Sequence, residues 1–361
     1  MTRTVGVEEE FFLFAVDEGR LRPAGEPVAD AADRRSDGQF EHELKREQAE
    51  LGTKPHRDLA ALRAELRERR AELGRAAAER GVRVVAVGTP PVESVASVTP
   101  DRRYERMHEV YGDTARTALT CGMHVHVGVG SREEGVRALN GVRGWLPVLL
   151  ALTANSPYAD GRDTGYASQR SMIWQRWPTA GPFELFHDLE DYDRTRAALV
   201  ETGAALDDAM LYFDARLSAT YPTLEIRAAD VCARVEDAVT VAALARALVD
   251  SAAAGALPPP TGVLARVELV RAATWRAARY GLTDELVSPL TGDPTAAGEV
   301  VGSLLELVGE SLRSAGDADV ARDGVARILE RGTGSDLQRR VLAERGELSA
   351  VVDVLAACTL A

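Results

Sequence analysis

The chain has 361 residues, 45% of them hydrophobic and 27% charged, which is typical of a globular protein and excludes a disordered chain. Its 43 basic and 56 acidic residues give a net charge of -13, which repels phosphate backbones, so we expect no nucleic-acid partner. The two lysines, Lys45 and Lys54, follow Leu44 and Thr53, which excludes a P-loop lysine and a kinase-type strand lysine.

The cysteines and the N-terminal sequence indicate a cellular compartment. Cys121, Cys232 and Cys358 are too few and too widely spaced for a disulfide framework or a zinc cage. The N-terminus, MTRTVGVEEEFF, has acidic residues where a signal peptide needs an apolar stretch. No apolar run approaches the roughly 18 residues of a membrane span. We therefore expect a cytoplasmic protein with no membrane partner.

The first 232 residues mix strand patterns with helix patterns. A leucine stripe predicts a helix over 57–80 that ends at Gly81. A second helix, over 133–154, is expected to be broken or kinked at Pro147, and a long polar loop follows over 155–181. Apolar runs and alternation predict strands over 4–14, 39–45, 82–88, 122–129, 211–217 and 223–228.

The rest of the chain shows only helical patterns, rich in Ala, Val, Leu and Arg. We expect a single catalytic domain over 1–361, with a sheet-containing part over 1–232 that carries the active site and a helical part over 233–361. The predicted helices of the second part are 236–254, 262–280, 295–315 and 320–357.

Polar residues recur two apart on three predicted strands, and residues two apart on a strand share a face. If these faces converge on one chamber, several carboxylates surround a common volume, which is costly unless cations neutralise them. Hard divalent ions such as Mg²⁺ or Mn²⁺ suit such an oxygen-rich set. The pairs are Glu8 with Glu10, His124 with His126 and Glu225 with Arg227, while Glu43 and Glu50 flank the end of the second strand.

Each of these patterns also has a purely structural interpretation. Acids near a terminus are commonly solvated, a His-x-His pair is commonly two hydrogen-bonded histidines, and Glu225 with Arg227 can be a simple ion pair. The acids of 8–10 run directly into FFLF, however, so their strand must be buried on at least one face. The polar loop with Arg162, Tyr166 and Arg170 is either a surface connection or an anchor for a carboxylate or phosphate.

Nine sequence runs, spread in order over about residues 4–310, carry a resemblance to a known family. They are GVEEEFF, ELKREQAELGT, GMHVHVG, LTANSPY, DTGYASQRS, WPTAGPF, YFDARLS, TLEIRAAD and WRAARYGL. With these runs the chain resembles the family-2 glutamate–cysteine ligases, which are ATP-dependent carboxylate–amine ligases.

The resemblance implies an α+β fold of the glutamine-synthetase-like type: a curved antiparallel sheet with helices packed outside and a helical C-terminal third. It also implies that ATP activates a carboxylate to an acyl phosphate, which an amine then attacks. The expected partners are a small-molecule acid and amine, glutamate with cysteine or a related pair. The expected cofactors are ATP and Mg²⁺ or Mn²⁺, and a homodimer is compatible with this picture.

The resemblance further implies roles for individual residues. It implies metal binding by Glu8, Glu10, Glu50, His124 and Glu225. It implies contacts with substrate or ATP by Glu43, Arg162, Tyr166, Arg170 and Arg227, of which Arg170 and Arg227 are also expected to take part in catalysis.

Two other functions stay open on the sequence alone. A guanidino-type kinase shares the same broad fold and phosphoryl chemistry but makes no amide. A catalytically silent metabolite-binding protein would keep the sheet as a scaffold, although it has no need for costly clustered acids.

Overall fold

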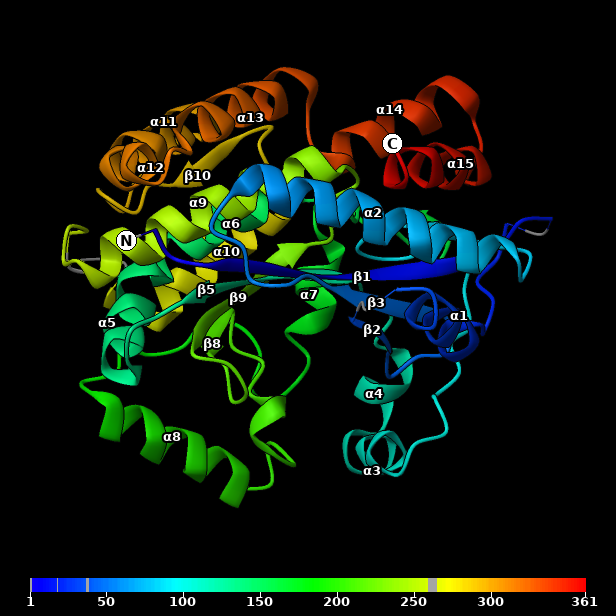
Figure 1. Ribbon diagram of the computed structural model, residues 1–361, viewed down its shortest axis with the longest axis horizontal. Helices are drawn as coiled ribbons and strands as arrows, with labels where there is room; N and C mark the ends of the chain where they lie inside the picture. The colour runs from blue at the N-terminus through cyan, green and yellow to red at the C-terminus, as the bar shows by residue number, and fades with distance from the viewer. Residues whose placement is uncertain (1, 18, 37–38, 259–264) are drawn as a thin grey trace.

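The computed structural model describes residues 2–17, 19–36, 39–258 and 265–361. In Figure 1 a sheet runs across the molecule, with a thick layer of helices above it and a few helices below it. The expected α+β class, with an antiparallel main sheet and a helical C-terminal region, is confirmed.

The main sheet has seven strands built around β1 (Val5–Ala15). Its order is β2-β3-β1-β5-β9-β8, and β4 also pairs with β1. Every pairing is antiparallel, and β5 and β4 pair with successive halves of β1. The other strands are β2 (Gln39–His42), β3 (Gln48–Gly52), β4 (Val82–Val85), β5 (Gly122–Gly128), β8 (Ala215–Leu217) and β9 (Thr223–Asp230).

Alternation along β1 gives the sheet two chemically different faces. Val5, Val7 and Glu9 are buried on the face turned toward the thick helical layer, whereas Glu8 and Glu10 are partly exposed on the other face. The apolar run from Phe11 onward is buried throughout, so the second half of the strand lies within the core.

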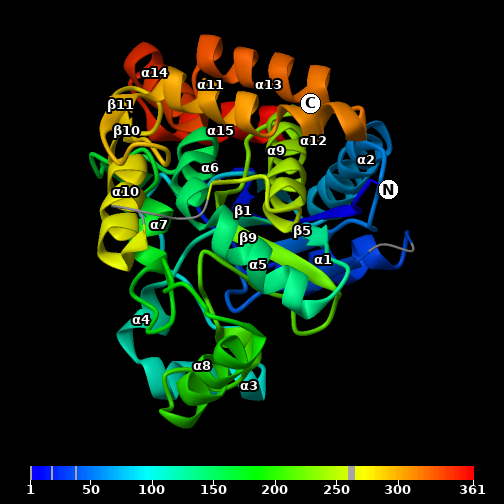
Figure 2. The same ribbon diagram turned by 90° about the vertical axis from the view of Figure 1, so that its left-hand side faces the viewer.

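The thick helical layer covers the apolar face of the sheet (Figures 1 and 2). Within it α9 packs on β1 and β5, α2 on β4, and α6 on β9. Asp58 caps α2 by accepting a hydrogen bond from the Ala60 N–H. The helices of this layer are α2 (Leu59–Ala78), α6 (Leu146–Thr153), α9 (Val235–Ala253), α10 (Val267–Tyr280), α11 (Ala297–Leu307), α12 (Gly309–Ala315), α13 (Ala318–Arg331), α14 (Gly334–Arg345) and α15 (Leu348–Thr359).

Smaller elements surround the other face and the ends of the sheet. In Figure 1 α3, α4 and α8 lie below the sheet. These elements are α1 (Gly25–Asp33), α3 (Arg102–Tyr111), α4 (Asp113–Thr117), α5 (Arg132–Val142), α7 (Gln169–Trp174), α8 (Leu189–Glu201), the 3₁₀ turns η1 (Arg143–Trp145) and η2 (Asp208–Met210), and the hairpins β6 (Tyr158–Ala159) with β7 (Arg162–Asp163) and β10 (Glu285–Val287) with β11 (Pro294–Ala296).

Several predicted boundaries were wrong. The second strand ends at His42, and a separate strand, β3, follows it and carries Glu50. The helix over 133–154 is interrupted at η1, before Pro147, which lies in the first turn of α6 where proline fits. The loop over 155–181 contains β6, β7 and α7.

The helical part also differs from the prediction in detail. The segment 320–357 holds parts of three helices, separated at Gly332 and Gly346, both of which have positive φ. The hairpin of β10 and β11 interrupts the helical series. The predicted helix start at 262 lies outside the described residues. No described helix is long and apolar enough to span a bilayer.

Candidate active site

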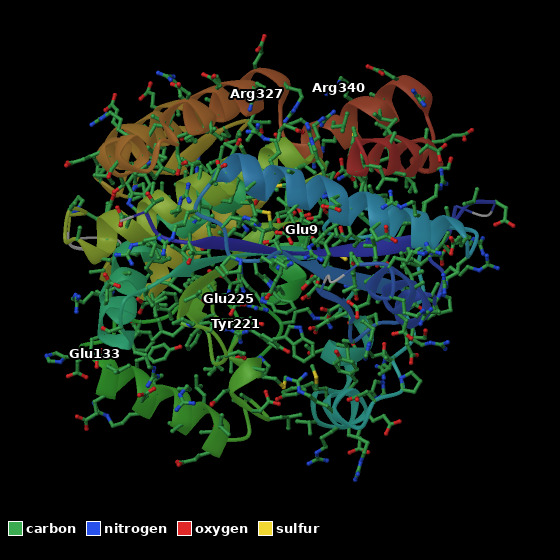
Figure 3. The ribbon with its side chains drawn as sticks, in the orientation of Figure 1. Glu9, Glu133, Tyr221, Glu225, Arg327 and Arg340 are labelled. Atoms are coloured by element: carbon green, nitrogen blue, oxygen red, sulfur yellow. The ribbon has the colours of Figure 1, made fainter. Side chains whose placement is uncertain are left out.

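A cavity of about 330 Å³ lies on the polar face of the main sheet, between the sheet and α3. Side chains from six strands, β1, β2, β3, β5, β8 and β9, line this chamber. Figure 3 shows Glu225 and Tyr221, two of its lining residues, below β1 and on the side away from the thick helical layer.

The antiparallel register brings the polar residues of neighbouring strands together. Glu8 lies opposite His124, Glu10 opposite Glu50, and His126 opposite Glu225. Directly opposite residues in adjacent strands share a face. The chamber is lined by eight of the residues singled out in the sequence: Glu8, Glu10, Glu43, Glu50, His124, His126, Glu225 and Arg227.

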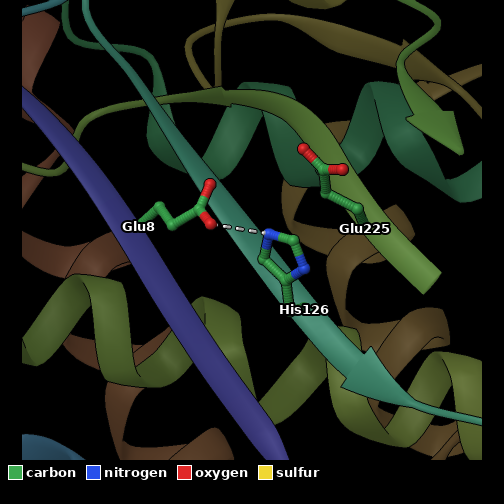
Figure 4. Close-up of side chains that lie close together, drawn as sticks. All are labelled: Glu8, His126 and Glu225. Atoms are coloured by element: carbon green, nitrogen blue, oxygen red, sulfur yellow. Dashed lines mark ion pairs between the residues drawn. The ribbon is translucent and has the colours of Figure 1, made fainter. Parts of the chain in front are cut away.

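The first group of possible metal ligands is Glu8, His126 and Glu225, whose ligand atoms lie within 4.8 Å of one another. In Figure 4 these side chains come from β1, β5 and β9 and point toward a common space. His126 Nε2 is 3.2 Å from Glu8 Oε1. On the other side of the ring, His126 Nδ1 is 3.1 Å from the Thr223 hydroxyl, which fixes the orientation of the imidazole.

The second group consists of Glu10, Glu43 and Glu50, again with ligand atoms within 4.8 Å. Burial raises the pKa of the Glu10 carboxyl, and the nearby charge of Glu43 raises it further. Burial also raises the pKa of Glu50 well above its ordinary value, with the charges of Glu43, Glu8 and Glu10 adding to the effect. Since like charges and poor solvation disfavour these carboxylates, a bound cation would relieve both.

His124 lies between the two groups. Its Nδ1 is 3.2 Å from Glu8 Oε2 and 3.9 Å from Glu225 Oε1, and its Nε2 is 3.8 Å from Glu10 Oε1. Burial lowers the pKa of His124, and the Arg227 charge lowers it further, so the neutral ring that can ligate a cation is favoured. Burial would raise the pKa of Glu8, but its hydrogen bonds with His124 and His126 outweigh burial and hold it below the ordinary value.

Two arginines balance the charge of Glu225. Arg216 Nε donates to Glu225 Oε2 at 2.8 Å, and Arg227 Nη1 donates to Glu225 Oε1. Burial acts to raise the pKa of Glu225, yet the charges of Arg227 and then Arg216 hold it below the ordinary value. The Arg227 guanidinium also lies 5.9 Å from the ring centres of Trp174 and Tyr212, which form an aromatic wall of the chamber.

The residues present fit a hard divalent cation. Among the described residues, the buried Nε2 atoms of His124 and His126 make no well-aligned hydrogen bond, and each faces a carboxylate, that of Glu10 at 3.8 Å and that of Glu8 at 3.2 Å respectively. Carboxylate oxygens and imidazole nitrogens around one volume are ligands that Mg²⁺ and Mn²⁺ accept. Such a cation beside arginines can neutralise and align phosphate groups.

A second cavity, of about 580 Å³, adjoins the chamber and shares Glu8, His126 and Tyr221 with it. It is lined by residues of the segments 2–7, 53–57, 128–130 and 221–223, together with Glu134 and Asp250. Glu8 and His126 of the first ligand group are therefore reached from two sides.

Three residues singled out in the polar loop do not line either cavity. Arg170 is 2% exposed and lies behind the chamber wall, against Trp174. Arg162 is exposed on β7. Tyr166 accepts a hydrogen bond from Trp275 Nε1 and contacts the Arg279 guanidinium at 5.7 Å, so it belongs to a surface cluster. The roles predicted for Arg162, Tyr166 and Arg170 stay predictions.

Sequence reasoning paired His126 with His124 but assigned a metal-binding role only to His124, and it did not single out Arg216, which lies in the run YFDARLS. Alternation places both histidines of the pair on one face, but it cannot tell which of them faces Glu8 and Glu225. Arg216 becomes visible only through its register position, directly opposite Glu225 on β9. Only knowledge that β8 pairs with β9 in this register would have pointed to Arg216.

Comparisons with known proteins give a consistent result. The family model described as "Glutamate-cysteine ligase family 2(GCS2)" matches residues 4–354. A protein of Frankia alni with the provisional name glutamate–cysteine ligase 2-2 is 48% identical, covering 98% of this chain and 96% of its own length. One of Streptomyces coelicolor, also provisionally named glutamate–cysteine ligase 2, is 48% identical over 99% of this chain and 98% of its own length.

Solved structures share the fold at low sequence identity. A glutamate–cysteine ligase of Francisella tularensis, solved in complex with AMP, superposes with a TM-score of 0.70 at 12% identity, covering all of this chain and 89% of that one. A bifunctional glutathione synthetase of Pasteurella multocida gives a TM-score of 0.66 at 18% identity, covering 99% of this chain and 56% of that one.

Proposed function

Because the chain belongs to glutamate–cysteine ligase family 2, we propose that it is an ATP-dependent ligase that joins a carboxylic acid to an amine through an amide bond. The observation that carries this proposal is the pairing of two acidic ligand groups with the buried Arg227 in one chamber. Glutamate and cysteine are the substrates that the family name suggests. We also propose that residues 1–361 act as one catalytic domain.

The metal part of the proposal rests on the two ligand groups. Glu8, His126 and Glu225 would hold one divalent cation and Glu10, Glu43 and Glu50 another, with His124 between them. When bound, such cations neutralise phosphate charge and orient the transferred group. The buried, mutually repelling acids support cation binding because they are otherwise held at a cost.

The reaction divides into two balanced steps. A substrate carboxylate oxygen attacks the γ-phosphorus of ATP, the bond from that phosphorus to the bridging oxygen breaks, and ADP leaves. The amine, having lost one proton from its ammonium form to water, then attacks the carbonyl carbon of the acyl phosphate. Inorganic phosphate leaves with the electron pair of the carbon–oxygen bond, and the nitrogen passes its second proton to that phosphate or to water as the amide forms. Arg227, which lines the chamber, would stabilise the charge that develops on the transferred phosphoryl group.

The two cavities suggest how the substrates are distributed. Both reach Glu8 and His126, so a nucleotide and an acid could meet at the first ligand group from different sides. The larger cavity, with Arg3 and Arg57 in its lining, is the one with more room for an adenosine group. The chamber, with Arg227 and the aromatic wall, would take the acid and the amine.

The experiment is a substrate screen. Purified full chain is incubated with ATP, Mg²⁺ and pairs of amino acids, and ADP release and product mass are recorded. The proposal predicts ADP release that requires both an acid and an amine and yields the mass of their amide. A phosphorylated amine without amide would indicate the kinase, and absence of ADP release with every pair would indicate a silent binding protein.

A further inference from the structure

Two motif segments that the proposed mechanism does not use, LTANSPY and DTGYASQRS, meet at one buried side chain, Asp230, at the end of β9. Asp230 is 0% exposed. Its Oδ2 accepts hydrogen bonds from the Asn155 N–H at 2.9 Å and the Ser156 hydroxyl at 2.7 Å, and its Oδ1 accepts one from the Ser168 hydroxyl at 2.8 Å. Asp230 therefore holds both ends of the loop that leads to α7.

A β-bulge places Asp230 on the polar face of the sheet. Between two cross-strand pairs, Met123 with Ala229 and Val125 with Ile226, β5 advances by two residues and β9 by three. The extra residue in β9 shifts its alternation, so that Asp230 lies opposite Gly122, which shares a face with His124. Without the bulge, Asp230 would face the opposite side.

Arg170 occupies the space above Gly122. A Cβ atom at position 122 would overlap the Arg170 guanidinium, so only glycine leaves room for it. Arg170 Nη1 is 3.9 Å from Asp230 Oδ1, the only carboxylate within ion-pair range of Arg170 among the described residues. Among the same residues, Arg170 Nε has no hydrogen-bond partner. Asp230 is thus the nearest counter-charge of this buried cation.

Arg170 in turn contacts the groups that shape the chamber. Its Nη2 donates to the Arg227 backbone carbonyl at 3.4 Å, and its guanidinium lies 5.7 Å from the ring centre of Trp174. The Arg227 guanidinium lies 5.9 Å from the same ring. Arg170 and Arg227 therefore share one aromatic surface, with Arg170 behind the chamber wall and Arg227 inside it.

We infer that Asp230 is a positioning residue for the ligase reaction: through Arg170 it fixes the Arg227 backbone and the Trp174 ring, and thereby the place of the Arg227 guanidinium in the chamber. This inference rests on the proposed function. A simpler role would be to anchor the loop through Asn155, Ser156 and Ser168, with no effect through Arg170. The two roles predict different coupling between residues 230 and 170.

The test is a double-mutant cycle with Asp230→Asn and Arg170→Gln. Asp230→Asn keeps the shape of the side chain and part of its hydrogen bonding but removes the charge that faces Arg170. We expect kcat to fall about tenfold with KM for ATP within about twofold, since neither residue lines a cavity. In the Arg170→Gln background, Asp230→Asn should change kcat by less than about twofold.

A matched control loosens the same loop from outside. Gln338 on α14 donates to the backbone and side-chain oxygens of Asn155 and touches neither Asp230 nor Arg170 through any hydrogen bond described. Gln338→Leu should lower the melting temperature and leave kcat within about twofold of the wild type. Equal losses from Asp230→Asn in both backgrounds, or a loss of kcat in Gln338→Leu matching that of Asp230→Asn, would overturn the inference.

A second readout needs no turnover. In protein labelled with 5-fluorotryptophan, the ¹⁹F resonance of Trp174 is assigned as the one that disappears in Trp174→Phe. Its chemical shift depends on the guanidinium groups of Arg170 and Arg227 that lie over that ring. We expect it to shift in Asp230→Asn and Arg170→Gln and to stay in place in Gln338→Leu. An unmoved resonance in Asp230→Asn overturns the inference. If the wild type forms no amide with any substrate pair, the proposed function fails, and this resonance still decides whether Asp230 positions Arg170.

Discussion

Glu10 shows how a single residue can be costly for the fold and necessary for the site. It is surrounded by other acids, and its one close polar partner described is the Gly122 N–H, at 2.6 Å from Oε2. Glu10→Gln exchanges one ligand oxygen for a neutral group of the same shape. We expect the fold to persist and the rate of amide formation to fall by about a hundredfold or more.

The check for Glu10→Gln is ADP-release kinetics beside a thermal melt. Glu133, exposed on α5 and outside both cavities, supplies the matched control, and Glu133→Gln should behave as the wild type (Figure 3). Normal turnover in Glu10→Gln would place Glu10 outside the reaction.

The substitution Arg227→Lys separates the effect of the positive charge at position 227 from the effect of the planar guanidinium shape. Lysine keeps the charge beside Glu225 but loses the planar fork and the flat surface that lies on Trp174 and Tyr212. We expect Arg227→Lys to lose about tenfold in kcat, or about 1.4 kcal/mol of transition-state stabilisation. Stopped-flow or steady-state ADP release measures the loss, and a variant with undiminished turnover would show that Arg227 serves only as an ion-pair partner.

Asp214 provides a pH-dependent prediction. Burial raises its pKa to about 7, although the charges of Arg170 and Arg271 oppose this. Between the ordinary pKa and about 7 the folded state binds more protons than the unfolded state, so the stability contributed by this group is lost as pH rises through that window. Asp214→Asn, which resembles the protonated form, should melt near the wild type at about pH 4 and several degrees higher at about pH 8.

Thermal melts across this pH range test the assignment. Asp17 is exposed, so the control variant Asp17→Asn should have the melting temperature of the wild type at every pH. A gap between Asp214→Asn and the wild type that does not widen with pH would mean that Asp214 titrates outside this window.

At the scale of elements, β1 is held from its apolar face by a buried ion pair. Between Glu8 and Glu10, Glu9 points the other way and accepts from Arg70 of α2, with Nε to Oε2 at 2.8 Å and Nη2 to Oε1 at 2.5 Å. Arg70 also donates to the backbone carbonyls of Cys232 and Thr359. The pair thus joins β1 to α2, to the start of the helical part and to the end of α15.

Breaking this pair should be strongly destabilising. Arg70→Met leaves Glu9 buried without a counter-charge, and we expect the free energy of unfolding to fall by about 3–5 kcal/mol in urea titrations. The double variant Glu9→Gln with Arg70→Met removes both charges and should recover part of the loss. Arg75→Met, which removes a largely exposed partner of Glu72, should lose less than about 1 kcal/mol. Equal losses at positions 70 and 75 would contradict this account.

The elements also show how far the sequence could lead. Alternation predicted that Glu8 with Glu10, His124 with His126 and Glu225 with Arg227 share faces, because a period of two is a local property. It did not predict β3, whose sequence QAELG has little strand character and which is specified by pairing with β1. Nor did it predict the β9 bulge, because a bulge is defined only against the partner strand. Helix ends at Gly332 and Gly346 were missed because a helical pattern continues beyond each.

At the scale of the whole molecule, the account requires that a divalent cation both stabilise the chain and permit the reaction. The ligand groups draw on β1, β3, β5, β9 and the segment after β2, so a bound ion connects distant parts of the sequence. Mg²⁺ or Mn²⁺ should raise the melting temperature in proportion to the logarithm of its concentration, and excess chelator should abolish ADP release. Full activity in chelator would remove the metal from the account.

The central claim is that ATP activates the acid's own carboxylate. The most direct test uses acid labelled with ¹⁸O in the carboxylate, together with ATP, Mg²⁺ and the amine, and measures the mass of the inorganic phosphate released. An acyl phosphate passes one labelled oxygen to phosphate for each amide formed, and this is the result we predict. Amide formation or ADP release with unlabelled phosphate would contradict the claim, because the oxygen would then have come from water or from ATP itself.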